Sequence, residues 1–241
     1  RDVERSRGLG DVYKRQTGYI METIVQRFIC LAIGYVFGLF QTGYMYGKMH
    51  GIDIRKEGSG NAGTTNALRV LGKKAGIITY IGDMVKAVLA ATVVRLIFGQ
   101  SHADIIMVLV LYSGFGVILG HNFPFYLGFK GGKGIAASSG VIVSLGYWPL
   151  ILLGFCTFMI VTIISRYVSL GSLVMMTGFL VEFIIFAVNG MIPGLYQAEL
   201  VEAIIIVAIL TVLAFWRHRA NIVRLVHGNE RKLWGGKKEN K

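Results

Sequence analysis

The chain has 241 residues, of which 54% are hydrophobic and 16% charged, and its mean hydropathy is +0.60. So few charged residues cannot cover the surface of a soluble globule of this size, so the composition excludes that class and predicts a polytopic membrane protein. The 25 Lys and Arg residues against 13 Asp and Glu give a net charge of +12. Beside apolar spans, this excess favours membrane lipids with anionic headgroups or a phosphorylated substrate as partners, and no nucleic acid.

The two ends of the chain differ from its apolar middle. Residues 1–20 are charged, contain glycine and lack an apolar period, and Met21 immediately precedes the first apolar stretch. We interpret residues 1–20 as a non-native or disordered extension and expect the authentic start at Met21. Residues 21–235 are predicted to form a single polytopic membrane domain, and residues 236–241 a basic tail.

Apolar stretches separated by helix-breaking residues predict an all-α integral membrane protein. A crossing helix needs roughly 20 apolar residues, and fewer inside a bundle. Breaks occur at "GQSHAD", "GYWP", "SRYVSLGS" and "NGMIPGLYQ". We predict about seven transmembrane helices, at residues 23–46, 74–98, 104–120, 134–147, 149–165, 170–188 and 199–216. The fourth and fifth are short and closely joined, and the alternative for them is one hairpin that does not fully cross.

The basic residues between the spans indicate an orientation. Lys and Arg lie in the loops after the first, third, fifth and seventh spans, whereas the connections at 99–103, near Trp148 and at 189–198 contain neither. By the positive-inside rule the C-terminus is then cytoplasmic and the N-terminus outside, with Arg27 as a mild exception. Three polar segments share the cytoplasmic face in this arrangement.

The first polar segment is "GSGNAGTTNALR", residues 58–69. It combines glycines, hydroxyls and an arginine: Gly58, Gly60, Gly63, Ser59, Thr64, Thr65 and Arg69. The glycines let backbone N–H groups approach an anion, the hydroxyls can donate to phosphate oxygens, and a helix beginning here would add its positive dipole end. We expect a phosphate site closed by the arginine. The alternative is a turn between helices whose glycines only relieve crowding.

The second segment, "GHNFPFYLGFKGGKGIA" at residues 120–136, pairs two lysines with three glycines: Lys130, Lys133, Gly131, Gly132 and Gly134. It resembles a Walker-type loop in composition but lacks that spacing, so we exclude nucleotide hydrolysis and expect an anion site. His121 precedes the loop, and we favour a hydrogen-bonded scaffold over a base for it.

The third segment, "WRHRANIVRLVHGNE", carries Arg217, Asn221 and Arg224 at i, i+4 and i+7. A helix continuing through them would present all three on one face, with His218 beside them. A basic helix end that anchors the last span at the headgroups is the alternative. The amide and the imidazole among the arginines favour a site.

Two charged residues, Asp83 and Lys86, fall within the second span at i and i+3. Each would cost roughly 2.5–3.5 kcal/mol at the centre of a lipid-facing helix, so we expect both to face inward. We favour a mutual structural pair, and the alternative is that they face the site. Cys30 and Cys156 lie in apolar spans without a nearby partner and are expected to be core residues.

From Met21 onward, the chain resembles the bacterial acyl-phosphate:glycerol-3-phosphate acyltransferases, the PlsY family. The resemblance covers about nine-tenths of the chain and rests on "GSGNAGTTN" with Arg69, on "GHNFPFYLGFKGGKGIA" and on "RHRANIVRLVHGNE". There are departures at Thr64, at Ala137 and at "GLFQTGY". The last removes a Ser and a Pro from the first span and counts against a polar role for that helix.

The resemblance implies a seven-helix enzyme of the bacterial cytoplasmic (inner) membrane with its active site on the cytoplasmic face. It would transfer a fatty acyl group from acyl phosphate to the 1-hydroxyl of sn-glycerol 3-phosphate, forming lysophosphatidic acid and phosphate. We expect a monomer without cofactor or metal. The expected catalytic residues are Ser59, Asn61, Arg69, Lys133, His218 and Asn221. The expected substrate-binding residues are Gly58, Gly60, Gly63, Thr65, Asn66, His121, Lys130, Gly131, Gly132, Gly134 and Arg224.

Acyl transfer from an acyl phosphate agrees with the absence of a recognisable catalytic base motif in the sequence. No His is followed five residues later by Asp, and no Ser-His-Asp order stands out. An acyl phosphate carries a good leaving group, so positioning and charge neutralisation suffice, and we expect the hydroxyl proton to pass to a substrate phosphate oxygen. Which phosphate occupies which loop stays open. A transporter for an organic phosphate is the alternative function, although no inverted repeat is visible.

Overall fold

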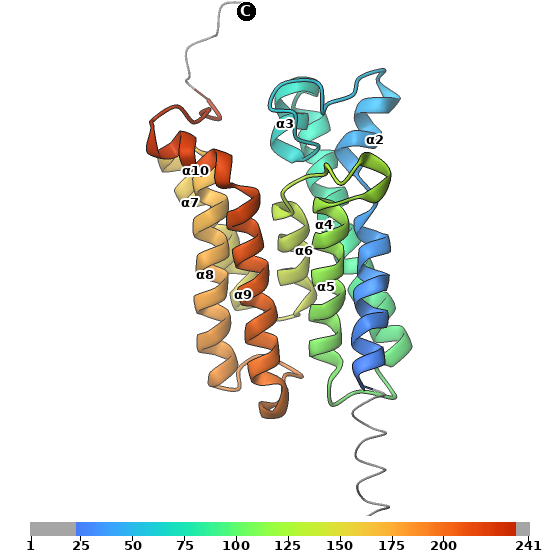
Figure 1. Cartoon of the computed structure of the whole chain (residues 1–241). Coiled ribbons are helices and arrows are strands. Elements are labelled where there is room, and N and C mark those ends of the chain that lie inside the picture. The colour runs from blue at the N-terminus through green and yellow to red at the C-terminus, as the bar shows by residue number, and fades with distance from the viewer. Residues whose placement is uncertain (1–22, 235–241) are drawn as a thin grey trace, which may run out of the picture.

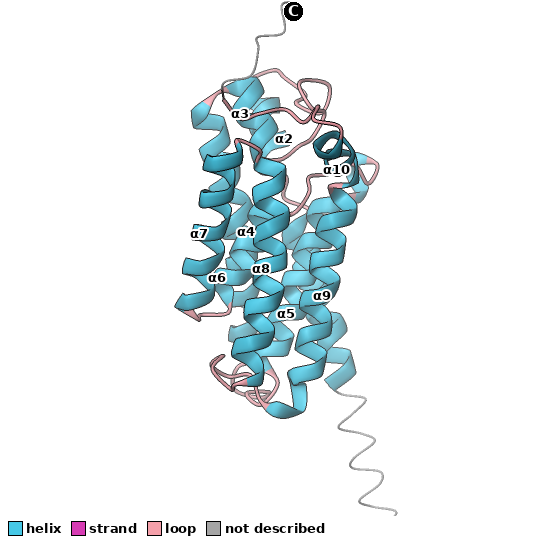
Figure 2. Cartoon of the chain, turned by 90° about the vertical axis from the view of Figure 1, so that its left-hand side faces the viewer, coloured by secondary structure: helices cyan, strands magenta, loops and turns pink. Residues whose placement is uncertain are grey.

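The computed structural model describes residues 23–234, and the predicted extension and basic tail lie outside them. The described part is a helical bundle (Figures 1 and 2). After the first helical stretch, which begins at Thr23, the elements are α2 (Thr42–Met49), α3 (Thr64–Leu71), α4 (Lys73–Phe98), α5 (Ile106–Asn122), the 3-10 turn η1 (Phe125–Leu127), α6 (Ile135–Ser144), α7 (Trp148–Ser165), α8 (Val168–Val188), η2 (Gln197–Glu199), α9 (Leu200–Arg217) and α10 (Arg219–Val226).

Six helical segments of the described chain are long and apolar enough to cross a membrane: Thr23–Met49, Lys73–Phe98, Ile106–Leu127, Trp148–Ser165, Val168–Val188 and Gln197–Arg217. The all-α membrane fold is confirmed. The predicted span at 134–147 differs, because α6 has only 10 residues. Ten residues rise about 15 Å, half of a hydrocarbon core, so α6 cannot cross alone. The residues before α6 form the glycine-rich loop, so they are not available to extend the helix to the length of a full span.

The first predicted span is also not one continuous helix. Its helix stops at Gly38, and residues 39–41 separate it from α2. Just before this break the helix packs closely against α5, where "GYVFG" at 34–38 meets "GVILG" at 116–120. A Cβ on Gly34 would lie 1.9 Å from the Ser113 carbonyl oxygen, and one on Gly116 would lie 2.1 Å from that of Leu31. Only glycines allow two backbones this close, as in other small-residue contacts between membrane helices.

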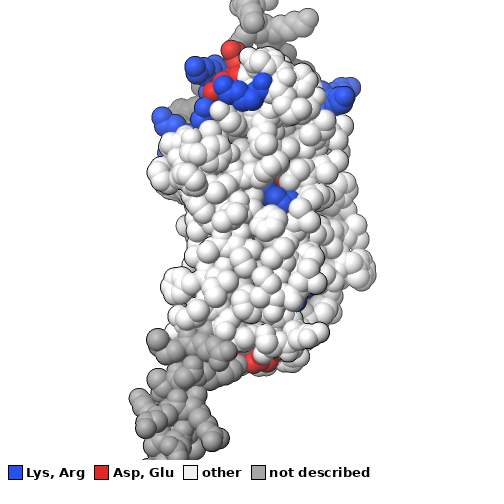
Figure 3. Space-filling model, turned by 90° about the vertical axis from the view of Figure 1, so that its right-hand side faces the viewer, with Lys and Arg blue, Asp and Glu red and all other residues white. Residues whose placement is uncertain are grey.

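The two ends of the bundle differ in charge. The end that carries α2, α3 and α10 holds the predicted basic segments, and the connections after α4 and α8 lie at the opposite end (Figure 1). On the face drawn in Figure 3, Lys and Arg gather mostly at the upper end, above a broad belt that shows only isolated basic atoms. Such a belt suits the hydrocarbon of a bilayer.

Candidate active site

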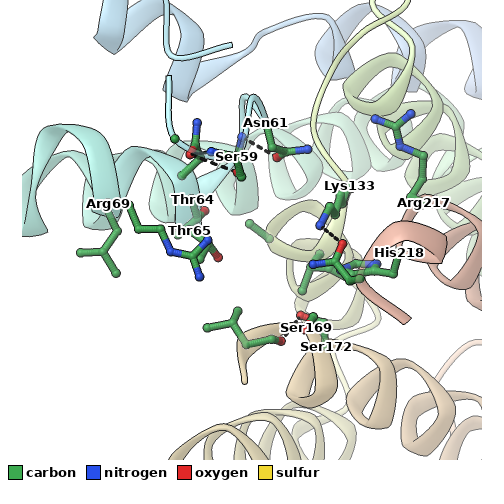
Figure 4. A pocket seen from close by; sticks show the side chains of 18 of the residues that line it. Ser59, Asn61, Thr64, Thr65, Arg69, Lys133, Ser169, Ser172, Arg217 and His218 are labelled. Atoms are coloured by element: carbon green, nitrogen blue, oxygen red, sulfur yellow. Dashed lines mark hydrogen bonds between the residues drawn. The ribbon is translucent and has the colours of Figure 1, made fainter. Parts of the chain in front are cut away.

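One cavity of about 1030 Å³ opens between α3, the 128–134 loop and α10, with α7 and α8 forming its remaining wall. In Figure 4, Arg69 and Thr65 approach from one side, and Lys133 and His218 from the other. The three segments that the sequence singles out therefore converge on one space. Every predicted site residue borders this cavity except Gly132, which lies directly behind its wall.

The first wall is the 58–66 loop and the start of α3. The predicted helix does begin in this segment, at Thr64. Gly58 and Gly60 have φ values of 58° and 70°, in the left-handed region where glycine is unstrained. Together they turn the backbone sharply around the Ser59 position, so the loop can present N–H groups toward the cavity.

Asn66 holds this loop in shape. Its Oδ1 accepts hydrogen bonds from the Ser59 backbone N–H at 2.8 Å and the Ser59 hydroxyl at 3.0 Å, and its Nδ2 donates to the carbonyls of Ile54 and Glu57. All four bonding positions of the amide are used. Asn61 similarly accepts from the Gly63 N–H at 2.9 Å. The geometry gives Asn66 a loop-holding role, whereas Ser59, Thr65 and Arg69 border the open space.

Arg69 lies at the mouth of the cavity. Its Nη2 donates to the Arg231 carbonyl at 3.3 Å, so α3 touches the segment that follows α10. Burial and then the positive charge of Arg231 lower the pKa of the Arg69 guanidinium below its ordinary value, but an arginine there stays charged. The cavity thus has a fixed cation on the α3 side.

Lys133 supplies the cation on the opposite side. Its Nζ donates to Oδ1 of Asn221 on α10. The pKa of the Lys133 ammonium is lowered from 10.5 to about 8, mainly by burial and in addition by the positive charges of Arg224, Arg217 and Arg69, against the opposing effect of Glu230. A lysine so crowded by positive charge gains stability when an anion arrives. Lys130 also borders the cavity but is exposed.

Arg217 borders the cavity and also holds its glycine loop. The helix does not continue through this segment, because α9 ends at Arg217 and α10 begins at Arg219. The Arg217 guanidinium donates to the Gly131 carbonyl at 3.1 Å and to the Gly132 carbonyl at 3.1 and 2.6 Å. It therefore holds the glycine loop that carries Lys133.

His218 occupies the break between α9 and α10. It is buried, and its Nδ1 lies 2.8 Å from the Ala214 carbonyl oxygen. Since a carbonyl only accepts, Nδ1 carries the proton and Nε2 is left as an acceptor. Burial, with the nearby charge of Lys133, lowers the pKa of His218 to about 4. The imidazole is consequently neutral at physiological pH and a weak base.

Glu230 organises α10 and was not among the predicted site residues. It accepts hydrogen bonds from Ser169 at 2.9 Å, Asn221 at 2.7 Å and Arg224 at 2.7 Å. Burial raises the pKa of this carboxyl, but these hydrogen bonds outweigh it and the pKa is lowered. Arg224 is thus neutralised by Glu230 instead of standing free. Glu230 could have been found from the sequence, because it is the last residue of the third motif. Nothing in the sequence marked Ser169 or Ser172 of α8, which also border the cavity.

Behind the glycine loop, the predicted pairing of Asp83 and Lys86 is confirmed. Lys86 Nζ lies 2.8 Å from Asp83 Oδ1, and both side chains are almost fully buried. His121 is tied to this pair, as the scaffold interpretation expects. The departure at "GLFQTGY" does not remove polar contacts from the first span. Gln41 donates to the His121 carbonyl at 3.1 Å, and Thr42 donates to Asp83 at 3.1 Å.

Comparisons with known proteins give one consistent result. A family model described as glycerol-3-phosphate acyltransferase matches residues 28–228. The glycerol-3-phosphate acyltransferase of Clostridioides difficile (strain 630) is 40% identical over 217 residues, covering 88% of this chain and 97% of that protein. That of Shouchella clausii (strain KSM-K16) is 39% identical over 220 residues, covering 89% and 98%.

Two solved structures are also similar. The crystal structure of PlsY (YgiH), an integral membrane glycerol 3-phosphate acyltransferase, in its glycerol 3-phosphate form superposes with a TM-score of 0.72 at 30% identity, covering 87% of this chain and 96% of that one. The lysophosphatidic acid form of the same enzyme gives a TM-score of 0.70 at 30% identity, covering 86% and 94%.

Proposed function

Because this chain belongs to the glycerol-3-phosphate acyltransferase family, we propose that it transfers a fatty acyl group from acyl phosphate to the 1-hydroxyl of sn-glycerol 3-phosphate. The products are lysophosphatidic acid and inorganic phosphate. The solved relative carries glycerol 3-phosphate in one form and lysophosphatidic acid in another, which supports this acceptor and product. The acyl phosphate donor rests on the resemblance of the three motifs and on the cavity described next.

The observation that carries the proposal is a cavity with a cation on each of two facing sides. Arg69 stands on α3 and Lys133 on the glycine loop. A reaction between an acyl phosphate and a glycerol phosphate brings two phosphate groups into one space, and two cradles suit that need. A thioester donor would carry no phosphate at its reacting carbon.

The α7 part of the remaining wall carries apolar side chains that suit an acyl chain. Phe158, Met159 and Ile163 of α7 border the cavity, and Ile163 is half exposed on the outer surface of the bundle. A cavity that meets polar loops on one side and a lipid-facing helix on the other fits an amphipathic donor. The acyl chain would lie against α7 while its phosphate reaches the loops.

The proposed chemistry is a direct acyl transfer. The 1-hydroxyl oxygen attacks the acyl carbonyl carbon, the carbon–oxygen bond to phosphate breaks, and the hydroxyl proton goes to a phosphate oxygen. A His218 with a pKa of about 4 is a poor proton acceptor, so its Nε2 orients the hydroxyl by accepting a hydrogen bond. Lys133 and Arg69 neutralise charge on the phosphates as the leaving group departs.

The same proposal includes where the reaction takes place. The basic end of the bundle, which holds the cavity, faces the cytoplasm of a bacterial inner membrane, with the C-terminus on that side and the N-terminus outside. Soluble glycerol 3-phosphate reaches the cavity from the aqueous side, and the acyl donor from the bilayer. The working unit is a monomer that uses neither a metal nor a cofactor.

The deciding experiment uses membranes that contain the protein, with radiolabelled glycerol 3-phosphate and one donor at a time: acyl phosphate, acyl-CoA or acyl carrier protein thioester. We expect labelled lysophosphatidic acid only with acyl phosphate. Product formed equally well from a thioester would overturn the donor assignment. Movement of label across sealed vesicles without product would instead indicate a carrier. Membranes containing an Arg69→Ala variant at the same protein level are the matched background.

A further inference from the structure

The buried ammonium of Lys86 lies behind the cavity and takes no part in the proposed chemistry. Its Nζ lies 2.8 Å from Asp83 Oδ1, 2.7 Å from the Phe40 carbonyl oxygen and 2.8 Å from Nδ1 of His121. The side chain is 4% exposed. A charged group buried this deeply in a membrane helix marks a functional arrangement more often than a structural one.

The three contacts fix the roles of the atoms. An ammonium has three donors and no acceptor, and the Asp83 carboxylate at 2.8 Å is its ion-pair partner. The Phe40 carbonyl and the Asp83 carboxylate can only accept, and the Gly38 carbonyl lies farther away at 3.5 Å, so the third proton points at the nearer His121 nitrogen. His121 Nδ1 must then be the accepting nitrogen, and its single proton sits on Nε2.

Nε2 of His121 faces the glycine loop. A Cβ on Gly132 would lie 2.0 Å from this nitrogen, and a Cβ on Gly131 would lie 2.0 Å from the His121 carbonyl oxygen. That carbonyl also accepts the Gly132 N–H at 3.1 Å. The imidazole and its own backbone therefore form the surface on which both glycines rest, immediately before Lys133.

The break in the first span completes the support. Residues 39–41 are not helical, which frees the Phe40 carbonyl to accept from Lys86. Gln41 is buried and donates to the His121 carbonyl. Arg217 holds the same glycine loop from its other side. The loop that presents Lys133 is thus fixed between a guanidinium and an imidazole, and the imidazole is fixed by Lys86.

We propose that Lys86 is a positioning residue for the acyl transfer: through His121, which it holds with the proton on Nε2, it fixes the Gly131–Gly132 loop and hence Lys133. At metal centres, groups that hydrogen-bond to the free ring nitrogen of a ligating histidine set its tautomer in the same way. The inference rests on the proposed function only where turnover is measured, because the tautomer of His121 can be observed without any substrate.

The first test is spectroscopic and uses the wild-type protein labelled with ¹⁵N-histidine in detergent micelles at pH 7. We expect His121 to show a protonated Nε2 and an unprotonated Nδ1, with its signals assigned by their loss in a His121→Asn variant. His218 should show the opposite tautomer, because its Nδ1 faces a carbonyl. A protonated Nδ1 on His121 would overturn the inference whether or not the protein transfers acyl groups.

The second test is kinetic. An Asp83→Asn, Lys86→Met double variant removes both charges and leaves no unpaired buried ion. We expect this variant to accumulate normally in membranes and to show both tautomers of His121. We also expect kcat/KM to fall on the order of 10²-fold, which is the effect of misplacing a positioning group such as Lys133 by about 1 Å. Unchanged kcat/KM in this variant would contradict the proposal.

A control and a second variant keep the kinetic result interpretable. The control is an Arg27→Met, Glu202→Gln double variant, which removes the ion pair at the opposite end of the bundle and should retain kcat/KM within about twofold. His121→Asn is the second variant: its amide can still accept from Lys86 but no longer reaches over Gly132. It should lose activity to a similar extent, and full activity in it would also refute the positioning role. Absence of acyl transfer in the wild type would instead count against the proposed function.

Discussion

The two halves of the bundle each contain a buried or partly buried ion pair between side chains of the membrane spans, and the two pairs serve different purposes. At one end, Arg27 binds Glu202 through two hydrogen bonds of 2.6 and 2.7 Å, and Tyr112 donates to the same carboxylate. This cluster ties the first span to α5 and α9 directly. In the half that holds the cavity, Asp83 and Lys86 lie three residues apart near the middle of α4. Their remaining hydrogen bonds go to the backbone break, to Thr42 and to a histidine.

The difference shows how a membrane bundle separates stability from positioning. A pair between helices holds those helices together and nothing more. The pair within α4 contacts the first span through Phe40 and Thr42, and it also reaches His121 behind the glycine loop. The cavity lies on the side of the bundle where the buried charge of Lys86 contacts loop backbone and the histidine behind the glycine loop. Changes at that end should therefore affect turnover, and changes at the far end stability.

The largest effect is expected from Arg69→Ala. This change removes the fixed cation on the α3 side of the cavity, and we expect turnover to fall on the order of 10³-fold while the protein remains in the membrane. Steady-state assays on membranes with matched protein levels measure it. Arg219→Ala is the control, since Arg219 stacks on Trp216 at the same end but does not border the cavity. Full activity in Arg69→Ala would remove this residue from the proposed site.

A smaller loss is expected from Gly132→Ala. The added methyl group would lie 2.0 Å from His121 Nε2, so the loop must move away from its support and take Lys133 with it. We expect kcat/KM to fall on the order of 10²-fold. Gly154→Ala on α7 is the matched control, because its methyl group would meet only Ile142 at 3.6 Å. Equal activity of the two alanine variants would mean that the loop tolerates displacement.

The pH dependence tests the charge of Lys133. Because its pKa is about 8 in the free protein, the protonated fraction falls as the pH rises through 8, and kcat/KM should fall about tenfold per pH unit above that value. Bound phosphate favours the charged form, so the limb in kcat should lie at higher pH. In Lys133→Arg the alkaline limb of kcat/KM should disappear, because an arginine stays charged. An identical limb in both proteins would assign the titration to another group.

The smallest effect is expected at the far end. Arg27→Met with Glu202→Gln should leave kcat and KM within about twofold and lower only the midpoint of thermal unfolding, followed by static light scattering in detergent. The pair is partly exposed, at 18% and 30%, so even the loss of stability should be modest. A selective loss of turnover here would erase the functional difference between the two ends.

Much of the cavity could be predicted because its chemistry needs residue types that stand out in an apolar chain. Glycines beside lysines, and an arginine after a run of hydroxyls, are conspicuous between membrane spans. The distribution of Lys and Arg then placed these segments on one side before any contact was known. The Asp83–Lys86 pair was likewise predictable, because an unpaired charge in lipid is too costly.

What could not be predicted depends on partners far apart in the sequence. Ser169 meets Glu230 across 61 residues, and Arg217 reaches Gly132 across 85. From the sequence alone, Arg217 could equally be interpreted as an anchor at the lipid headgroups. The break at residues 39–41 has no proline to announce it, because it is stabilised by a lysine and a glutamine side chain and not by local propensity. Likewise, nothing in the sequence around Asn66 shows that its side-chain amide makes all of its hydrogen bonds to the loop.

The glycine contact between the first span and α5 also bears on leakage. Just below Lys86, two backbones touch with no room for a methyl group, and α5 is buried along most of its length. A wet cavity that opens at one end of a bundle is a hazard to a membrane that stores energy as an ion gradient. Backbone packed against backbone below the cavity excludes water and ions more tightly than side chains that can change rotamer would. A larger residue at Gly34 or Gly116 would thus threaten the insulation of the membrane as well as the fold.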